Sequence, residues 1–130
     1  MWVQYNPNPT TGRRIGDCAV RAVSKALDTT WEKAFLLLCV NAFNMGDLPN
    51  SNNVIASVLR QHGFKRLPLP TDCPDCYTYE EFLEKNPKGT FVLFSDNHVA
   101  TAVDGILFDS WDSSECPIMY VWYKDKEPQF

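Results

Sequence analysis

Residues 97–112 have the sequence NHVATAVDGILFDSWD, and the rest of the architecture can be worked out from this stretch. Residues 98–103 and 106–110 are two runs rich in β-branched and aromatic side chains, which favour strands. Between them stands Asp104-Gly105, a pair that favours the two-residue turn of a β-hairpin. The sequence therefore predicts two antiparallel strands joined by a tight turn.

Further elements are predicted on either side of this hairpin. Runs at 90–94 and 118–124 add strands, which places an antiparallel sheet in the C-terminal part of the chain. Helical periodicity and capping residues predict helices starting at Cys18 and spanning 31–43, 53–62 and 79–85, with a short strand at 64–69. Helices followed by an antiparallel sheet indicate an α+β fold. No linker or repeat interrupts the chain, so residues 1–130 are expected to form a single domain.

The two ends of the chain are expected to lack regular structure. Two Asn-Pro steps, at 6–7 and 8–9, push the first seventeen residues toward extended, irregular backbone. Residues 124–130 mix charges with a proline, and we expect them to be flexible.

The composition excludes several classes of protein. Hydrophobic residues make up 45% and charged residues 22% of the 130 residues, which is typical of a globular domain and not of a disordered chain. A net charge of -4 argues against nucleic acid or anionic membrane as a partner, because proteins that bind these usually carry a basic face. The longest apolar run, 34–40, is far too short to span a bilayer. No export signal opens the sequence, so we expect a cytoplasmic chain whose five cysteines are free thiols.

Cys18 is the cysteine with the most distinctive position. It is expected in the first turn of a helix, directly after Asp17, where the helix dipole and unpaired N–H groups stabilise a thiolate. Arg21, one turn further on, would lower the pKa of the thiol, whereas the charge of Asp17 would raise it. The alternative is a small buried cysteine that only fills the first turn.

His98 is the histidine best placed to act as a base for this thiol. His62 closes a helix, where a cation suits the dipole, so its position has a structural explanation. His98 opens a strand and has no such local reason. A histidine at the end of a sheet that faces the start of a cysteine-bearing helix has the geometry of a Cys–His pair. Alone, His98 could equally be a strand histidine with its hydrogen bonds satisfied.

Pairing across the Asp104-Gly105 turn predicts which side chains share a face. With a two-residue turn Val103 pairs with Ile106, and side chains alternate between faces along each strand. One face then carries His98, Ala100, Ala102, Leu107, Asp109 and Trp111. The small side chains at 100 and 102 leave room for a helix to approach, and Trp111 is placed to shield His98 from water.

Asp109 is the residue expected to orient His98. It is the diagonal neighbour of His98 in this register, at a Cβ spacing of about 7 Å, within reach of a carboxylate–imidazole contact. A one-residue bulge in the turn would instead place Asp112 opposite His98, so Asp112 is the second candidate. Both aspartates could also be ordinary solvated residues.

The residues named above, with their neighbours, resemble the papain-like cysteine peptidases. The similarity lies in Gly16-Asp17-Cys18-Ala19-Val20-Arg21-Ala22, Trp31, Asn97-His98-Val99, Asp104-Gly105 and Asp109-Ser110-Trp111-Asp112. More narrowly, the chain is similar to the small forms carried by bacteriophages and related mobile elements, which would place it in the host cytoplasm. The match spans residues 16–112, but its specific parts total fewer than about twenty positions.

The resemblance implies a fold, a reaction and a set of catalytic residues. A helix with the cysteine at its start would pack on an antiparallel sheet that carries the histidine and the aspartate. Cys18 would attack an acyl carbon as a thiolate, His98 would shuttle the proton and Asp109 would fix the tautomer of His98. The substrate would be a protein or peptide, its peptide or isopeptide bond cleaved through a thioester, and neither a cofactor nor a metal is implied.

The sequence departs from the family pattern at the oxyanion site. Papain-like enzymes commonly carry a glutamine a few residues before the nucleophile, and residues 11–14 contain none. Gln4, Asn6 or Asn8 could swing in from the N-terminal arm, with the Cys18 backbone N–H as a second donor. Asn6 is our candidate. Losing one such donor typically costs about 3 kcal/mol of transition-state stabilisation.

Two other functions share this sequence pattern. A catalytically weak or inactive member of the fold would act as a protein-binding or inhibitory module. A transferase or deamidase would use the same three residues with a different acceptor. Cys73 and Cys76 form one CxxC, which we interpret as a loop pair and not a zinc site, because a structural zinc needs four ligands.

Overall fold

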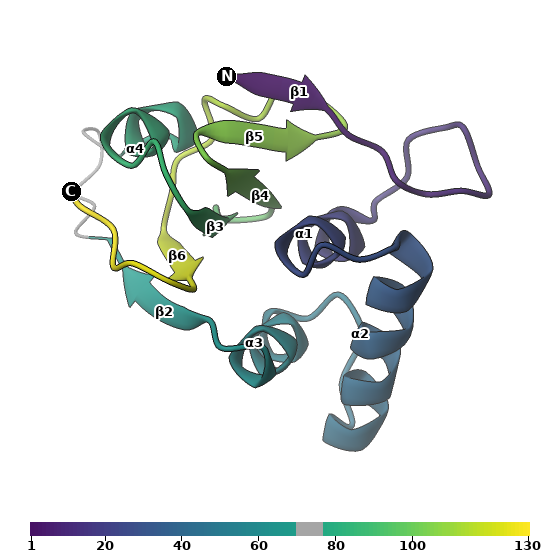
Figure 1. The fold of residues 1–130 in the computed structure, drawn as a ribbon. Helices are drawn as coiled ribbons and strands as arrows, with labels where there is room; N and C mark the ends of the chain where they lie inside the picture. The colour runs from purple at the N-terminus through teal and green to yellow at the C-terminus, as the bar shows by residue number, and fades with distance from the viewer. Residues whose placement is uncertain (70–76) are drawn as a thin grey trace.

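The computed structural model describes residues 1–69 and 77–130, and in this part the chain has an α+β fold (Figure 1). The helices are α1 (Cys18–Ala26), α2 (Trp31–Met45), α3 (Asn52–Gln61) and α4 (Tyr79–Lys85). The strands are β1 (Trp2–Gln4), β2 (Lys65–Pro68), β3 (Thr90–Phe94), β4 (Val99–Val103), β5 (Ile106–Asp109) and β6 (Tyr120–Tyr123). None of these helices is long and apolar enough to cross a bilayer.

The hairpin predicted around Asp104-Gly105 joins β4 to β5. Val103 pairs with Ile106, so the predicted register is confirmed. Asp104 and Gly105 both have positive φ angles, 50° and 79°, the conformation that a tight two-residue hairpin turn requires. The Asp-Gly pair therefore sets the register because it tolerates this backbone at little cost.

The described strands form one mixed sheet in the order β1-β5-β4-β3-β6-β2. The C-terminal strands predicted from the sequence pair antiparallel, but the sequence does not predict β1. The difference arises at the N-terminus, where β1 runs parallel to β5 instead of being irregular. The Leu107 N–H donates to the Met1 carbonyl at 2.8 Å, and the Tyr5 N–H donates to the Asp109 carbonyl at 2.7 Å. A strand of three residues is too short to show an alternating pattern of apolar and polar side chains, so the sequence of β1 does not reveal it. The strand forms where it can pair with the otherwise open edge of β5.

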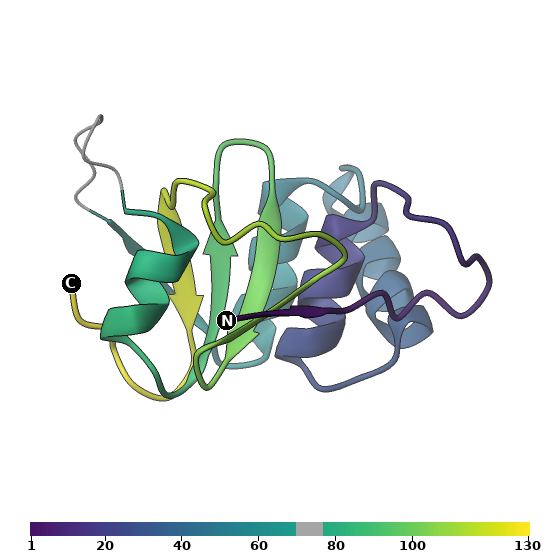
Figure 2. The ribbon, with the colours of Figure 1, turned by 90° about the horizontal axis from the view of Figure 1, so that it is seen from above.

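Helices cover both faces of the sheet (Figure 2). Helices α1, α2 and α3 lie on one side of the sheet, where α1 contacts β3, β4 and β5 and α2 packs on α1 and α3. The buried residues on this side include Val23, Leu38, Leu59, Phe94 and Trp122. Helix α4 packs on the other face, around Tyr79, Phe82, Leu93, Ala102 and Leu107. The helix that approaches the small residues Ala100 and Ala102 is thus α4, not the helix that carries Cys18.

Local capping explains where the helices begin and end. The Thr30 hydroxyl accepts a hydrogen bond from the Lys33 N–H at 3.2 Å and starts α2. Helix α2 extends beyond the predicted residue 43 to Gly46, whose φ of 67° gives the left-handed end that glycine favours. Thr78 and Glu81 form a reciprocal capping box at the start of α4.

The C-terminal segment 124–130, expected to be flexible, is held at one point. The side-chain amide of Asn86 donates to the Gln129 carbonyl at 2.8 Å, and the Gln129 N–H donates to Asn86 Oδ1 at 2.7 Å. Asn86 directly follows α4, so these two bonds hold Gln129 against the end of this helix. The composition of the segment gives no hint of a partner that lies in another element.

Candidate active site

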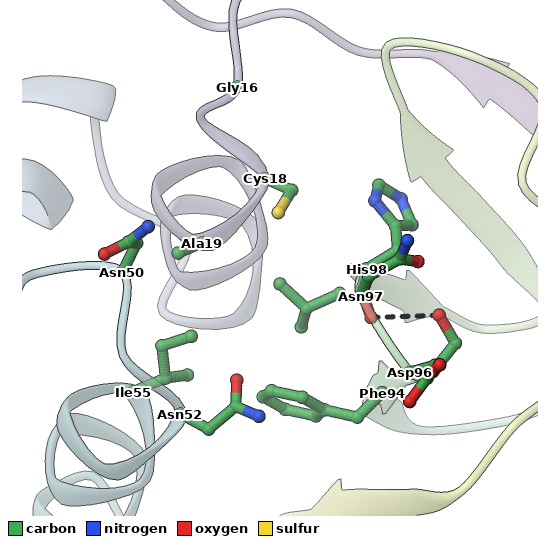
Figure 3. A pocket seen from close by; sticks show the side chains of 12 residues that line it. Gly16, Cys18, Ala19, Asn50, Asn52, Ile55, Phe94, Asp96, Asn97 and His98 are labelled. Carbon is green, nitrogen blue, oxygen red and sulfur yellow. Dashed lines mark hydrogen bonds between the residues drawn. The ribbon is translucent and has the colours of Figure 1, made fainter.

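Cys18 and His98 line the same pocket, which lies where the start of α1 meets the loop before β4 (Figure 3). The pocket has a volume of about 210 Å³. The side-chain amides of Asn50, Asn52 and Asn97 also line it. Cys18 is half-buried in the first turn of its helix, and His98 directly precedes β4, so the two are brought together from opposite sides of the pocket.

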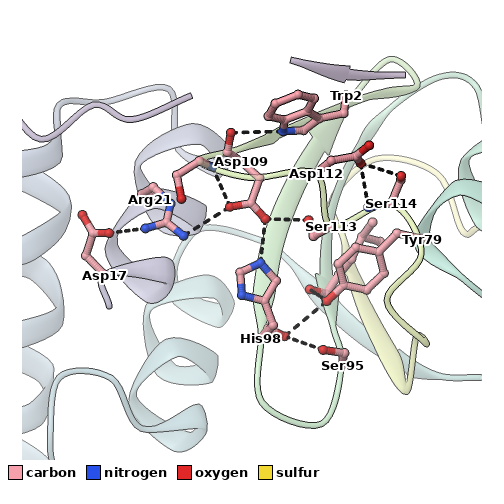
Figure 4. Close-up of polar contacts among 12 residues, drawn as sticks. Trp2, Asp17, Arg21, Tyr79, Ser95, His98, Asp109, Asp112, Ser113 and Ser114 are labelled. Carbon is pink, nitrogen blue, oxygen red and sulfur yellow. Dashed lines mark hydrogen bonds and ion pairs between the residues drawn. The ribbon is translucent and has the colours of Figure 1, made fainter. Parts of the chain in front are cut away.

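His98 is held by Asp109. The His98 Nε2–H donates to Asp109 Oδ2 at 2.6 Å, and Asp109 is only 1% exposed (Figure 4). With Nε2 occupied by the carboxylate, Nδ1 is the ring nitrogen left for the thiol. The Trp111 ring packs against the imidazole at a centroid distance of 4.7 Å and shields it from solvent.

The carboxylate of Asp109 is fixed by donors on both oxygens. Oδ1 accepts from Arg21 Nη2 at 3.2 Å and from the Ser110 N–H at 2.7 Å. Oδ2 accepts from the Ser113 hydroxyl at 2.6 Å in addition to His98. Burial would raise the pKa of Asp109, but the bonds from His98 and Ser113 and the charge of His98 bring the pKa below its ordinary value. Asp109 is therefore an ionised acceptor with one orientation.

The pKa values of Cys18 and His98 are shifted toward a charged pair. Burial would raise the pKa of the Cys18 thiol, but interaction with His98, with the Val99 N–H and with Arg21 lowers it overall. Burial would lower the pKa of His98, but Asp109 and Cys18 raise it to about 9. A thiol with a lowered pKa beside an imidazole with a raised pKa favours thiolate and imidazolium.

Arg21 joins the start of the helix to this site. It is 4% exposed, and besides Asp109 its guanidinium pairs with Asp17 one turn earlier. The other oxygen of Asp17 accepts from Trp31 Nε1 at 2.9 Å. These contacts engage the Asp17 side chain, which makes no capping bond to α1. The spacing Asp17–Arg21 is that of an i,i+4 ion pair, but the sequence alone does not reveal that Arg21 also reaches Asp109.

The second candidate for orienting His98, Asp112, lies elsewhere. It is exposed and accepts hydrogen bonds from the N–H of Ser114 at 3.1 Å and from its hydroxyl. The hairpin has no bulge in its turn, so the register that would place Asp112 opposite His98 does not occur.

The structure does not place Asn6, the candidate oxyanion donor, among the residues that line the described cavities at Cys18. Neither cavity that Cys18 lines includes Asn6, Gln4 or Asn8. The chain at Gln4 is committed to β1, and the side chain of Asn8 accepts hydrogen bonds from the N–H groups of its own turn. The pocket receives its side-chain amides from the α2–α3 loop, the start of α3 and the loop before β4 instead.

The remaining candidate groups lie apart from the site or outside the described residues. His62 Nδ1 contacts the Val58 carbonyl at 2.8 Å at the end of α3. Cys73 and Cys76 belong to the segment 70–76, outside the described residues. Among the residues that are described, no group of three or more histidine, cysteine or acidic side chains is arranged to hold a metal ion.

Chemically, the arrangement offers an activated nucleophile, a base within reach and a fixed carboxylate behind the base. These are the parts of a site for attack on an acyl carbon. Comparison of the chain with family models, with curated proteins and with solved structures finds no match.

Proposed function

We propose that this protein is a cysteine peptidase or amidase of papain-like fold, with Cys18, His98 and Asp109 as its catalytic residues. The observation that carries the proposal is the 2.6 Å bond from His98 Nε2 to a fully buried, ionised Asp109, in a ring whose other nitrogen serves the Cys18 pocket. A carboxylate, an imidazole and a thiol in this order are the parts that acyl transfer needs. The α+β arrangement, with the cysteine at a helix start and the histidine and aspartate on the sheet, fits the same family.

The reaction would proceed through a thioester. The Cys18 thiolate attacks the carbonyl carbon, the C–N bond breaks, and the leaving amine takes the proton from His98 Nδ1. Water then gives a proton to His98 while its oxygen attacks the thioester, and the C–S bond breaks to return the Cys18 thiolate. Asp109 remains ionised throughout and stabilises the imidazolium.

The first turn of α1 would stabilise the oxyanion. Asp17 does not cap this helix, so the N–H groups that a cap would engage remain free to point at a developing negative charge. The Cys18 N–H is the donor nearest to the tetrahedral carbon in this scheme. A second donor would come from the pocket amides of Asn50, Asn52 or Asn97.

Thiol reactivity tests the proposal directly. At about pH 6, well below the pKa of about 8.5 of an ordinary thiol, iodoacetamide should modify Cys18 ahead of Cys39 and Cys116. The variant His98→Ala should lose this preference. Labelling of Cys18 at the rate of the other thiols, measured by mass spectrometry of peptides, would overturn the proposal.

A second experiment distinguishes hydrolysis from transfer. The products formed from a peptide substrate are compared with and without an added amine.

A second candidate function is a protein-binding module without catalysis, and the surface of α2 favours it. Large apolar side chains stand on this helix and just after it with high exposure, among them Leu36 (61%), Val40 (58%), Phe43 (86%) and Leu48 (68%). Contiguous exposed apolar surface on a small protein often marks an interaction site. A normal, unactivated Cys18 would favour this function over the first.

A further inference from the structure

An apolar groove lies between α1 and α2, next to the Cys18 pocket. It has a volume of about 310 Å³, and Ile15, Trp31, Phe35 and Pro49 form its walls. The groove shares Gly16, Ala19 and Asn50 with the pocket that holds Cys18 and His98, so the two adjoin each other across these residues. A chain bound across Cys18 would therefore meet this groove next.

The walls of the groove are built from fixed aromatic rings. Trp31 and Phe35 stack with centroids 5.2 Å apart and an angle of 15° between their planes. Trp31 Nε1 donates to buried Asp17, so the polar atom of the indole is satisfied within the protein. Phe35 is 40% exposed and Ile15 is 37% exposed, which leaves apolar surface open to a ligand.

The groove offers no free charge to a ligand. Its one charged residue is Asp17, whose two oxygens are taken by Arg21 and by Trp31. A charged group placed here would lose water without gaining a partner, whereas an apolar group would gain from burial. The volume lies at the small end of the range of about 300–1,000 Å³ for ligand sites, enough for one large side chain and too little for a helix.

We propose that this groove is the substrate-selecting subsite of the enzyme, and that it binds an aromatic or large aliphatic side chain of the peptide beside the bond that Cys18 attacks. The proposal rests on the proposed function, because the groove gains this role from its position next to the Cys18 pocket. Phe35, Trp31 and Ile15 are then the residues that determine specificity.

Two alkylating reagents that react with a thiol in the same way test the proposed subsite. Iodoacetamide and N-benzyl iodoacetamide both transfer a carbon to sulfur with loss of iodide, and they differ only in the apolar group. The ratio of their rates at Cys18, followed by mass spectrometry, is compared with the same ratio for glutathione. If the groove buries the ring, the ratio of the benzyl rate to the iodoacetamide rate should be at least about 10-fold higher for Cys18 than for glutathione. The rate of the benzyl reagent at Cys18 should also saturate as its concentration rises.

Variants inside and outside the groove locate the effect. Phe35→Gln and Ile15→Gln should each bring the ratio toward that of glutathione. Phe43→Gln removes a more exposed aromatic ring of α2 that does not line the groove, and it should keep the wild-type ratio. Circular dichroism and thermal melts establish that each variant is folded.

The outcomes separate the two proposals. Fast labelling of Cys18 by iodoacetamide with a glutathione-like ratio overturns the subsite and leaves the proposed function standing. A high ratio that survives both Phe35→Gln and Ile15→Gln also overturns the subsite. Slow labelling of Cys18 by both reagents overturns the proposed function and, with it, the substrate assigned to the groove.

Discussion

At the scale of single residues, Asp109 differs from Asp112, three positions away, in the number of donors that surround it. Asp109 receives His98, Arg21, Ser113 and the Ser110 N–H on its two oxygens, whereas Asp112 contacts Ser114 at the surface. A buried carboxylate is tolerable only with such a set of partners. The same partners fix the orientation of the carboxylate. The stability of the buried carboxylate and the orientation of the imidazole bound to it therefore have one structural cause.

Replacing each carboxylate in turn should show that Asp109 and Asp112 have different effects on the rate of hydrolysis. Asp109→Asn presents an amide to His98 and favours the wrong tautomer, so we expect hydrolysis to fall by about 10²- to 10⁴-fold. Asp112→Asn, the matched control, should change the rate by less than about twofold, since its side chain is exposed. Steady-state rates on a peptide substrate measure both. Equal losses in the two variants would contradict the role given to Asp109.

The pKa shifts predict a bell-shaped dependence of kcat/KM on pH. The pKa of Cys18 lies below that of an ordinary thiol, so the Cys18 thiolate forms at pH values below about 8.5. His98 has a pKa of about 9, so it keeps the proton that the leaving amine needs until the pH rises through this value. The alkaline limb should therefore fall near pH 9. An acid limb at the ordinary pKa of a thiol would refute the charged pair.

Arg21 lies between two buried carboxylates, and its removal should destabilise the fold. Arg21→Met leaves Asp17 and Asp109 without their shared cation, which we expect to lower the free energy of unfolding by about 3–5 kcal/mol. Arg13→Met, at an exposed position, should change it by less than about 0.5 kcal/mol. Urea denaturation of both variants checks this. A loss under about 1 kcal/mol for Arg21→Met would argue that the guanidinium is dispensable.

At the scale of elements, the contact between α1 and β4 sets the separation of Cys18 from His98. The Thr101 hydroxyl donates to the Ala22 carbonyl at 2.7 Å, and Thr101 is fully buried. This bond lies one helical turn after Cys18 and three residues after His98, so it fastens the two elements close to the site. The sheet face that carries it is the one that α1 covers.

Thr101→Val should loosen this contact with little change in shape. We expect a loss of about 0.5–1.5 kcal/mol in the free energy of unfolding and slower alkylation of Cys18 at about pH 6. Thr90→Val, at the end of β3 that lies away from His98, is the control and should leave the alkylation rate unchanged. Unchanged alkylation in Thr101→Val would show that the bond does not hold the two elements in place.

The sequence predicts those elements whose signals are local. The Asp104-Gly105 turn predicts the hairpin register, and Thr78 with Glu81 predicts α4, because each signal lies within the element it defines. Alternation shows that β4 has two faces, but it does not show which helix covers which face. The parallel pairing of β1, the Arg21–Asp109 contact and the pocket amides join distant segments, so no local pattern carries them.

At the scale of the whole molecule, the N-terminal strand β1 contacts the backbone of Asp109. Besides the Tyr5 N–H, Trp2 Nε1 donates to the Asp109 carbonyl at 3.2 Å, so β1 holds the backbone that presents the carboxylate. Without β1, strand β5 would be an open edge of the sheet. The position of the Asp109 carboxylate thus depends on a segment about a hundred residues earlier.

Deleting residues 1–5 should expose this dependence. The Leu107 N–H loses its acceptor, the Met1 carbonyl, and should exchange its hydrogen faster. We expect slower hydrolysis as well, because the Asp109 backbone is freed. Hydrogen exchange followed by NMR measures the first effect, and the Val92 amide in the centre of the sheet is the internal reference. Protection of Leu107 equal to that in the full chain would rule out a supporting role for β1.

The pairing of β1 with β5 also has a consequence during translation. β1 and Cys18 leave the ribosome before His98 and Asp109, and about eighty further residues must be added in between, at about 5–20 residues per second. Contacts between such remote segments form late in folding. A nascent chain that has not yet reached His98 therefore carries Cys18 as a thiol without its imidazole partner, and the pair forms only after His98 and Asp109 have been added.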